Sequence, residues 1–246
     1  MTLPAAMPPS LENSTSRFHP AALTPFTLLD FPGEVACIVW FSGCTMRCPY
    51  CHNPDLVRDH AGTLSPEDLV TFLETRRGNL TGVVLSGGEA TLCPDLPHIA
   101  ESAKARGYKV KLDTNGTRPE VVESLWHAGL VDAVALDYKA PPARERTVTG
   151  RASHGAAFRR SLTFLIAAAR EGLTFTVRTT VHPDLLSEHD LAWIIQDLDR
   201  AGYQGTYTLQ RINTWGAKTL GQVPQPSRTV DVARLPIPRG FNVAWR

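Results

Sequence analysis

The sequence predicts an α/β fold, a partial (βα)6 barrel with a parallel sheet, from two patterns and the length of the chain. Short runs of β-branched and apolar residues alternate with longer segments of helical character, which is the pattern of repeated βα units. Four of the five helical segments end at a glycine, the residue that most readily closes a helix in the left-handed conformation. With 246 residues, 43% of them hydrophobic, the chain can bury the core of one large domain.

The strands and helices can be placed in order along the chain. The apolar runs predict six strands, over Val35–Phe41, Gly82–Leu85, Lys109–Asp113, Ala133–Tyr138, Thr174–Thr180 and Thr206–Leu209. The segments between them predict helices over Ser65–Arg77, Pro94–Arg106, Arg118–Ala128, Phe158–Glu171 and Ser187–Ala201. The first helix begins with the capping-box pattern Ser65-Pro66-Glu67-Asp68. The other four are followed by Gly107, Gly129, Gly172 and Gly202.

The two ends of the chain are less regular than its middle. We expect a flexible tail over residues 1–22, the barrel over residues 23–211, and an irregular C-terminal cover over residues 212–246. The cover is rich in Pro, Arg and Gln and ends in a short apolar stretch, residues 241–245, which could form a late edge strand. It is either a candidate docking surface for a partner or a plain structural tail. Residues 141–154 are expected to form a flexible loop that could act as a lid.

Charge and hydropathy exclude several classes of partner. The formal net charge of +1 gives no electrostatic footprint for nucleic acid or for an anionic membrane. No apolar run approaches the length needed to cross a bilayer, and the first twenty residues lack a basic region followed by an apolar core. We therefore expect a cytoplasmic protein with neither a nucleic acid nor a membrane as partner.

Three of the five cysteines, Cys44, Cys48 and Cys51, lie in a C-x3-C-x2-C pattern directly after the first expected strand. A [4Fe–4S] cluster is normally held by four cysteines, so three would leave one iron open for chemistry. The alternative is a structural zinc site that His52 completes as Cys3His, although zinc motifs usually bring two separated ligand pairs. Disulfides are a weaker interpretation, because the cysteine count is odd and no signal peptide is present. The remaining Cys37 and Cys93 are expected to be structural or incidental.

Polar residues also follow each of the remaining expected strands. They lie at the carboxyl ends of the strands, where parallel folds collect their reactive groups. Asp137 and Lys139 are two residues apart and therefore share a face, which predicts an ion pair. Each group has a structural alternative, such as a tight turn, a helix cap or a structural ion pair. Their joint placement facing the cysteines predicts a binding site made of Ser86-Gly87-Gly88-Glu89, Asp113-Thr114-Asn115-Gly116, Asp137-Tyr138-Lys139, Arg178 and Gln210-Arg211.

The cysteine pattern, with Tyr50 as the aromatic residue before the third cysteine, resembles the C-x3-C-x-aromatic-C motif of radical S-adenosylmethionine (SAM) enzymes. The resemblance runs in order from about Phe26 to about Gln210. Four further motifs look like those of glycyl-radical-enzyme activating proteins. They are most similar to the motifs of the proteins that activate anaerobic ribonucleoside-triphosphate reductase, and pyruvate formate-lyase activating enzymes are near relatives. The four motifs are Leu28-Leu29-Asp30-Phe31-Pro32-Gly33, Cys51-His52-Asn53-Pro54, Ser86-Gly87-Gly88-Glu89-Ala90-Thr91-Leu92 and Asp113-Thr114-Asn115-Gly116.

This resemblance implies a role for each site residue. The three cysteines would bind one [4Fe–4S] cluster, whose open iron would chelate the amino and carboxylate groups of SAM. Gly87, Gly88 and Glu89 would receive the methionine ammonium group, because a cation needs acceptors. Asp113 and Asp137 would hold a monovalent cation, and Lys139 would pair with the carboxylate of SAM. Tyr50 would lie against the adenine, and Asn115 and Arg178 would make further contacts with the cofactor.

The reaction implied is radical chemistry on a protein substrate. In this family a reduced cluster passes one electron to SAM, and the resulting 5′-deoxyadenosyl radical takes a hydrogen atom from a glycine of a partner enzyme. The expected activity is that of an activating oxidoreductase whose partner is anaerobic ribonucleotide reductase, with a flavodoxin or a ferredoxin-type protein as electron donor. Alternatives are a pyruvate formate-lyase partner, a small-molecule substrate as in carboxy-deazaguanine synthases, and a non-catalytic metal-binding module.

Three departures from the family pattern limit the resemblance. Ala90 stands where many members have proline, and no histidine lies after the sixth strand, where pyruvate formate-lyase relatives often have one. No further cysteines lie between Cys51 and Gly87, so the ferredoxin-like insert of some activating proteins is missing. We therefore expect a single cluster.

Overall fold

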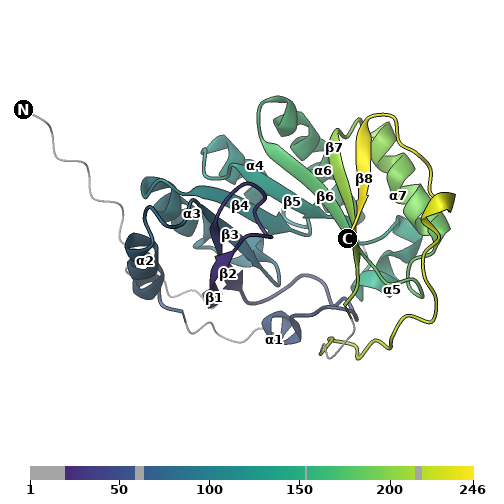
Figure 1. Cartoon of the computed structure of the whole chain (residues 1–246), viewed down its shortest axis with the longest axis horizontal. Helices are drawn as coiled ribbons and strands as arrows, with labels where there is room; N and C mark the ends of the chain where they lie inside the picture. Colours follow the sequence, from purple (N-terminus) through teal and green to yellow (C-terminus); the bar gives the residue numbers. More distant parts are fainter. Residues whose placement is uncertain (1–19, 59–63, 153, 214–217) are drawn as a thin grey trace, which may run out of the picture.

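The computed structural model, which describes residues 20–58, 64–152, 154–213 and 218–246, contains one eight-stranded sheet with strands in sequential order from β1 to β8 (Figure 1). β1 runs antiparallel to β2, and every later neighbour is parallel, as a partial barrel of βα units requires. The six expected strands are confirmed to within two residues at each end. The strands are β1 Pro20–Thr27, β2 Ala36–Phe41, β3 Gly82–Gly87, β4 Lys109–Thr114, β5 Ala133–Asp137, β6 Thr174–Val181, β7 Gly205–Arg211 and β8 Phe241–Trp245.

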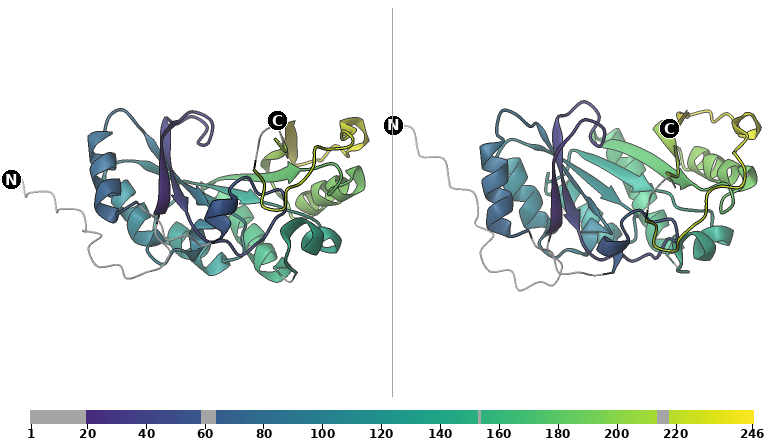
Figure 2. Two further views of the ribbon diagram at one scale, coloured as in Figure 1. Left: turned by 90° about the horizontal axis from the view of Figure 1, so that it is seen from below. Right: turned by 60° about the horizontal axis from the view of Figure 1, so that its bottom comes forward.

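The five expected helices are present as α2, α3, α4, α6 and α7, and they cover the outer face of the curved sheet (Figure 2). The Ser65 hydroxyl accepts a hydrogen bond from the Asp68 amide, but the full capping box, with both reciprocal bonds, forms at Ser187 and Asp190 instead. The helices are α1 Pro54–Val57, α2 Pro66–Thr75, α3 Leu96–Ala105, α4 Pro119–His127, α5 Glu145–Thr149, α6 Gly155–Arg170 and α7 Glu188–Arg200, with 3-10 turns η1 Ala90–Leu92, η2 Pro142–Arg144 and η3 Val232–Arg234.

Both edges of the sheet extend beyond the expected barrel. The expected tail is too long, because residues 20–22 belong to β1; residues 1–19 lie outside the described part of the chain. Two prolines, Pro20 and Pro25, argue against a strand at this place in the sequence. Proline is nevertheless compatible with an edge strand that changes register, as β1 does between Thr24 and Thr27. At the other edge β8 pairs with β7, so the late edge strand is confirmed and the sheet continues past residue 211.

Residues 141–154 do not form the expected loop. They fold into η2 and α5, and the Thr149 hydroxyl bonds the backbone oxygens of Glu145 and Arg151, each at 2.8 Å. Gly150 ends α5 in the left-handed conformation, with φ of 68°. Residue 153 lies outside the described residues. The prediction of a loop is therefore wrong for the part of this segment that the structure describes.

The two faces of the sheet differ in polarity. Apolar side chains of the strands pack outward against the helices, whereas the inner face is apolar only near the beginnings of the strands, where Phe31, Ile38 and Val84 cluster. Further along, inward positions carry polar groups such as Ser86 and Arg178, because side chains alternate between the two faces of a strand. No helix in the described segments is long and apolar enough to cross a membrane.

Candidate active site

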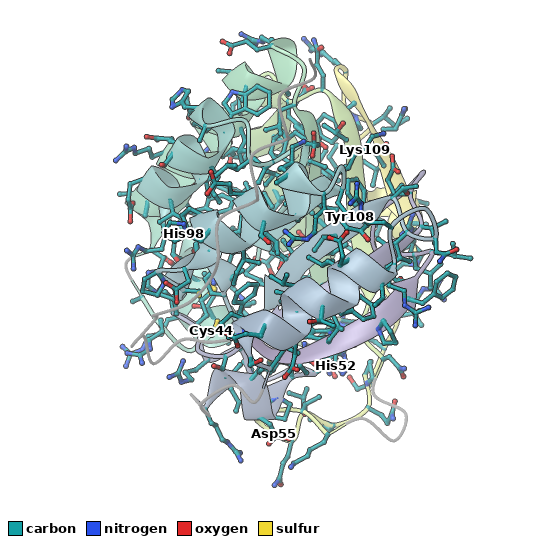
Figure 3. All side chains as sticks on the ribbon, turned by 90° about the vertical axis from the view of Figure 1, so that its left-hand side faces the viewer. Cys44, His52, Asp55, His98, Tyr108 and Lys109 are labelled. Atoms are coloured by element: carbon teal, nitrogen blue, oxygen red, sulfur yellow. The ribbon has the colours of Figure 1, made fainter. Side chains whose placement is uncertain are left out.

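The cysteine loop, residues 42–53, connects β2 to α1 at the carboxyl ends of the parallel strands. In Figure 3 Cys44 and His52 lie below Tyr108 and Lys109, which mark the beginning of β4. Cys44, Cys48 and Cys51 all line one cavity of about 400 Å³. This volume falls within the range of about 300–1,000 Å³ typical of small-molecule sites.

Segments distant in sequence fix the backbone of the cysteine loop. The Arg47 amide donates to the Thr149 carbonyl at 2.7 Å, so α5 supports the middle of the loop. From the C-terminal cover, the Gly221 amide donates to the Pro49 carbonyl at 2.7 Å, and the Leu220 amide donates to the Cys51 carbonyl at 3.0 Å. The cover is therefore part of the architecture of the site, a role that the sequence did not reveal.

Without a bound group, the surroundings of this loop disfavour the charged thiolate form of its cysteines. Burial raises the pKa of Cys44 to about 12 and also raises that of Cys48, because the buried thiolate loses its hydration. Two buried hydroxyls of the loop, Ser42 Oγ and Tyr50 OH, make no hydrogen bond of ordinary geometry with the described residues. Thiols and hydroxyls of this kind fit a loop that is completed by a bound cationic group.

The zinc alternative requires the three cysteines and His52 to surround one ion. Among the described residues, no three His, Cys, Asp or Glu side chains gather around one point as ligands of a single ion. His52, the proposed fourth zinc ligand, is exposed to solvent. In a [4Fe–4S] cluster each cysteine binds a different iron, so the thiols stand further apart than around one zinc ion. Cys37 and Cys93 are buried in the core and do not line the cavity.

Gly87 and Gly88 allow the loop after β3 to contact the backbone that leads into the cysteine loop. A Cβ atom on Gly87, where φ is 137°, would lie 2.3 Å from the Phe41 carbonyl oxygen, and one on Gly88 would lie 2.0 Å from the Gly43 carbonyl oxygen. The Gly88 amide donates to Phe41, and the Glu89 amide donates to Gly43. Both glycines are thus required by close backbone approach.

Glu89 is buried, and its carboxylate joins the end of β3 to the end of β4. Oε1 accepts hydrogen bonds from the amide and hydroxyl of Thr91 and from the Thr114 hydroxyl, while Oε2 accepts one from the Asn115 amide at 2.7 Å. Burial outweighs these bonds and raises the pKa of Glu89. Four donors of the protein fix this carboxylate in place, and Oε2, which accepts only the Asn115 amide, keeps acceptor capacity for the expected ammonium group.

Asn115 connects β4 to the cysteine loop. Its Nδ2 donates to the Thr45 hydroxyl at 3.0 Å and lies 3.8 Å from Cys44 Sγ, within hydrogen-bonding distance of sulfur. Its Oδ1 accepts from the amide and the hydroxyl of Thr117, which fixes the orientation of the side chain. Asn115 therefore positions the first cysteine.

Five charged side chains form a continuous row along the inner face, here called the charged row: Lys111, Asp113, Arg178, Asp137 and Lys139. Lys111 bonds Asp113 Oδ1, and Arg178 Nη2 lies 3.2 Å from Asp113 Oδ2. Arg178 Nε also bonds Asp137 Oδ1, and Lys139 Nζ lies 3.0 Å from Asp137 Oδ2. The predicted pairing of Asp137 with Lys139 is confirmed.

The charges of this row stabilise one another. Burial alone would raise the pKa of Asp137, but Arg178 and Lys139 outweigh it and hold this pKa well below its usual range. Burial alone would likewise lower the pKa of Lys139, but Asp137 outweighs it and holds this pKa above its usual value. With three cations and two carboxylates, the row carries a net charge of +1 and attracts an anionic group into the cavity.

The cavity is lined by Cys44, Cys48, Tyr50, Cys51, Gly87, Gly88, Glu89, Asp113, Asn115, Asp137, Lys139 and Arg178, and by Ser86, Thr114 and Gln210 from the same predicted strand ends. Gly116, Tyr138 and Arg211, which the sequence also placed in the site, do not line it. Asp30, Trp40, Met46 and Thr180 also line it and were not predicted. Lys111, which bonds Asp113, was missed as well. Strand alternation could have indicated Lys111 and Thr180, because each lies two residues from a cavity-lining residue on its strand, Asp113 and Arg178 respectively.

A comparison with known protein families identifies this arrangement. The model of the Radical SAM superfamily matches residues 38–197, a span that runs from β2 into α7 and contains the three cysteines and the charged row. The chain belongs to the radical SAM superfamily.

Its similarity to individual members of the radical SAM superfamily narrows the assignment. The chain is 31% identical over 182 residues to a pyruvate formate-lyase 1-activating enzyme of Escherichia coli, covering 70% of this chain and 71% of that one. It is 28% identical over 224 residues to a protein of Methanocaldococcus jannaschii assigned as a glycyl-radical enzyme activating enzyme, covering 89% and 86%. The resemblance to radical SAM enzymes that activate glycyl radical enzymes is therefore confirmed.

Solved structures of radical SAM enzymes share the fold at low identity. SuiB of Streptococcus suis bound to S-adenosylmethionine gives a TM-score of 0.58 at 13% identity, over 74% of this chain and 41% of that one. Native anSMEcpe with bound AdoMet gives 0.54 at 18% identity, over 70% and 49%. The expected α/β partial barrel is confirmed.

The radical SAM family implies a [4Fe–4S] cluster and SAM, and the residues of this site fit both. Cys44, Cys48 and Cys51 would hold the cluster, which supplies one-electron reduction when bound. The net-positive charged row suits the carboxylate of SAM, and the glycine loop brings backbone groups close to the cysteines. The protein's contribution is to orient the cofactor in a partly buried cavity.

Proposed function

We propose that this enzyme reductively cleaves SAM to a 5′-deoxyadenosyl radical and installs a glycyl radical on a partner enzyme, the anaerobic ribonucleoside-triphosphate reductase. The membership of the glycyl-radical activating family carries the radical chemistry. The choice of partner rests on the likeness of four sequence motifs, from Leu28–Gly33 to Asp113–Gly116, to the reductase-activating proteins. A flavodoxin or a ferredoxin-type protein would supply the electron.

One observation of the site supports this proposal above the others. The three cysteines, the glycine loop and the net-positive charged row line the same cavity, so one SAM molecule could contact all three groups at once. A metal-binding module without catalysis would need the cysteines alone. The combination of the three groups in one cavity therefore fits an enzyme that binds both a cluster and SAM.

The proposal is tested by anaerobic reconstitution of the protein with iron and sulfide, followed by reduction and addition of SAM and the same organism's anaerobic ribonucleotide reductase. We expect a glycyl doublet in the electron paramagnetic resonance spectrum and one 5′-deoxyadenosine per radical. A reductase grown with α-deuterated glycine should transfer deuterium into that deoxyadenosine. A doublet that forms only with pyruvate formate-lyase would keep the chemistry and refute the partner.

A small-molecule substrate is the second candidate, favoured by one finding. The chain is 33% identical over 132 residues to a 7-carboxy-7-deazaguanine synthase of Methanopyrus kandleri, although this covers only 45% of this chain and 52% of that one. Deoxyadenosine formation stimulated by a small molecule, with no radical on either glycyl radical enzyme, would support this second function.

A further inference from the structure

The two aspartates expected to hold a monovalent cation are already bonded by side chains of the protein. Asp113 receives Lys111 on Oδ1, and on Oδ2 it receives the Ser86 hydroxyl at 3.1 Å and Arg178 Nη2 at 3.2 Å. Asp137 receives Arg178 Nε on Oδ1 and Lys139 Nζ on Oδ2. All four carboxylate oxygens therefore have a cationic donor.

The position of Arg178 explains how one side chain serves both aspartates. In the parallel pairing of β5 with β6, Arg178 stands directly beside Asp137, and its planar guanidinium has enough donors to reach Asp113 on β4 as well. The side chains involved are shielded, with 8% of Asp113, 19% of Asp137 and 21% of Arg178 exposed. A guanidinium held between two carboxylates thus occupies the place at which a bound cation would bridge them.

The charge of the row leads to the same conclusion. Its net charge of +1 would be neutralised by one ligand carboxylate, with no additional cation. A sodium or potassium ion entering the row would stand near three positive side chains, which repel it. It would also have to displace Arg178 from at least one carboxylate.

We propose that Arg178, supported by Lys111, replaces the monovalent cation in this protein, so that SAM binds without sodium or potassium. This inference rests on the proposed function, in which SAM is the cofactor, and it concerns a positioning residue. Lys111 holds one oxygen of Asp113 and leaves the other for Arg178. The cationic group is then covalently part of β6 and does not exchange with the medium.

The decisive experiment uses the wild-type protein with its cluster reconstituted. The dissociation constant of SAM is measured by anaerobic equilibrium dialysis in potassium, sodium or choline chloride at equal ionic strength. We expect values that agree within about twofold, because choline is too large to bridge the aspartates and the site needs no ion. An affinity about tenfold higher in potassium or sodium would overturn the proposal. Failure to bind SAM in every salt would contradict the proposed function as well.

A variant pair sharpens the result. Arg178→Gln removes the bridging charge, and we expect SAM binding about tenfold weaker in choline, with part of the loss recovered in potassium or on addition of guanidinium ion. Arg160→Gln, which breaks an exposed pair with Glu123, is the control and should bind SAM like the wild type in every salt. Wild-type affinity of Arg178→Gln in choline would overturn the proposal.

A second readout does not depend on SAM or on the variant. The melting temperature of the apo wild-type protein should be the same in potassium and choline chloride at equal ionic strength, because Arg178 already pairs both carboxylates. A rise specific to potassium would show that the aspartates bind the ion, and the proposal would be wrong. If Arg178→Gln folds, its melting temperature should rise in potassium relative to choline.

Discussion

The cysteine loop and the charged row face the same cavity but differ in how far the protein's own groups satisfy them. In the cysteine loop, burial raises the pKa of two thiols, and two buried hydroxyls make no hydrogen bond of ordinary geometry with the described residues. In the charged row, every carboxylate oxygen is paired with a cationic group. The first region fits an inserted group that supplies positive charge, and the second is a preorganised receptor for a negative group.

This difference explains why the two regions are built on different parts of the fold. A loop can adapt to an inserted group, whereas strands fix the spacing of charges that must pair with one another. The charged row lies on β4, β5 and β6, whose register places Asp137 beside Arg178. The cysteine loop instead depends on hydrogen bonds from α5 and from the C-terminal cover. The predictions below test the division, from the largest expected effect to the smallest.

Removal of one thiol should destroy the function of the cysteine loop and leave the fold intact. We expect Cys48→Ala to lose its iron–sulfur cluster and to reduce deoxyadenosine formation by at least about 10³-fold, because two cysteines cannot hold the cluster. Iron content, visible absorbance and product formation measure this. Cys93→Ala is the matched control, a buried cysteine outside the cavity, and should keep its cluster. Cluster loss in that control would refute the ligand assignment.

A Cβ atom at the junction between the two regions should be the next most damaging change. Gly88→Ala places this atom 2.0 Å from the Gly43 carbonyl oxygen, so the backbone must move, and we expect unfolding to become easier by at least about 3 kcal/mol. Urea denaturation of the apo protein measures it. Gly155→Ala is the control, since its Cβ would meet nothing within 4 Å at the start of α6, and it should be neutral or slightly stabilising. Equal effects for both variants would contradict the close-contact argument.

The charged row should respond differently, losing ligand affinity with its partner region intact. Lys139→Met removes one cation beside Asp137, and we expect SAM to bind about 10- to 100-fold more weakly, since a charge-assisted hydrogen bond contributes about 1.5–3 kcal/mol. Equilibrium dialysis on cluster-loaded protein measures it. Lys109→Met breaks a pair with Glu34 at the beginning of β4, away from the cavity, and should leave binding unchanged. An unchanged isotherm for Lys139→Met would reduce this lysine to a structural role.

The sequence predicted most of the barrel and most of the residues that line the cavity, because strand period, helix ends and local motifs depend on neighbouring residues. It did not predict β1, whose prolines suit only an edge strand. Nor did it predict that Leu220 and Gly221 hold the cysteine loop, since such contacts join residues about 170 positions apart. The four hydrogen bonds to Glu89 likewise depend on how β3 and β4 meet, which no local pattern encodes.

The smallest expected effect is the opposite pH dependence of one carboxylate near each region. The pKa of Glu89 is raised above 4.5 in the folded protein, so its contribution to stability falls as the pH rises from about 4.5 through that folded pKa. The pKa of Asp137 is lowered below 3.8, so its contribution is complete above pH 3.8 and is lost as the pH falls through the folded pKa. Urea denaturation of apo wild type, Glu89→Gln and Asp137→Asn between pH 3 and 8 separates the two. The cost of Asp137→Asn should shrink toward low pH, and that of Glu89→Gln should shrink toward high pH. If the losses of unfolding free energy caused by the two substitutions shrank toward the same pH extreme, the opposite pKa shifts of Glu89 and Asp137 would be refuted.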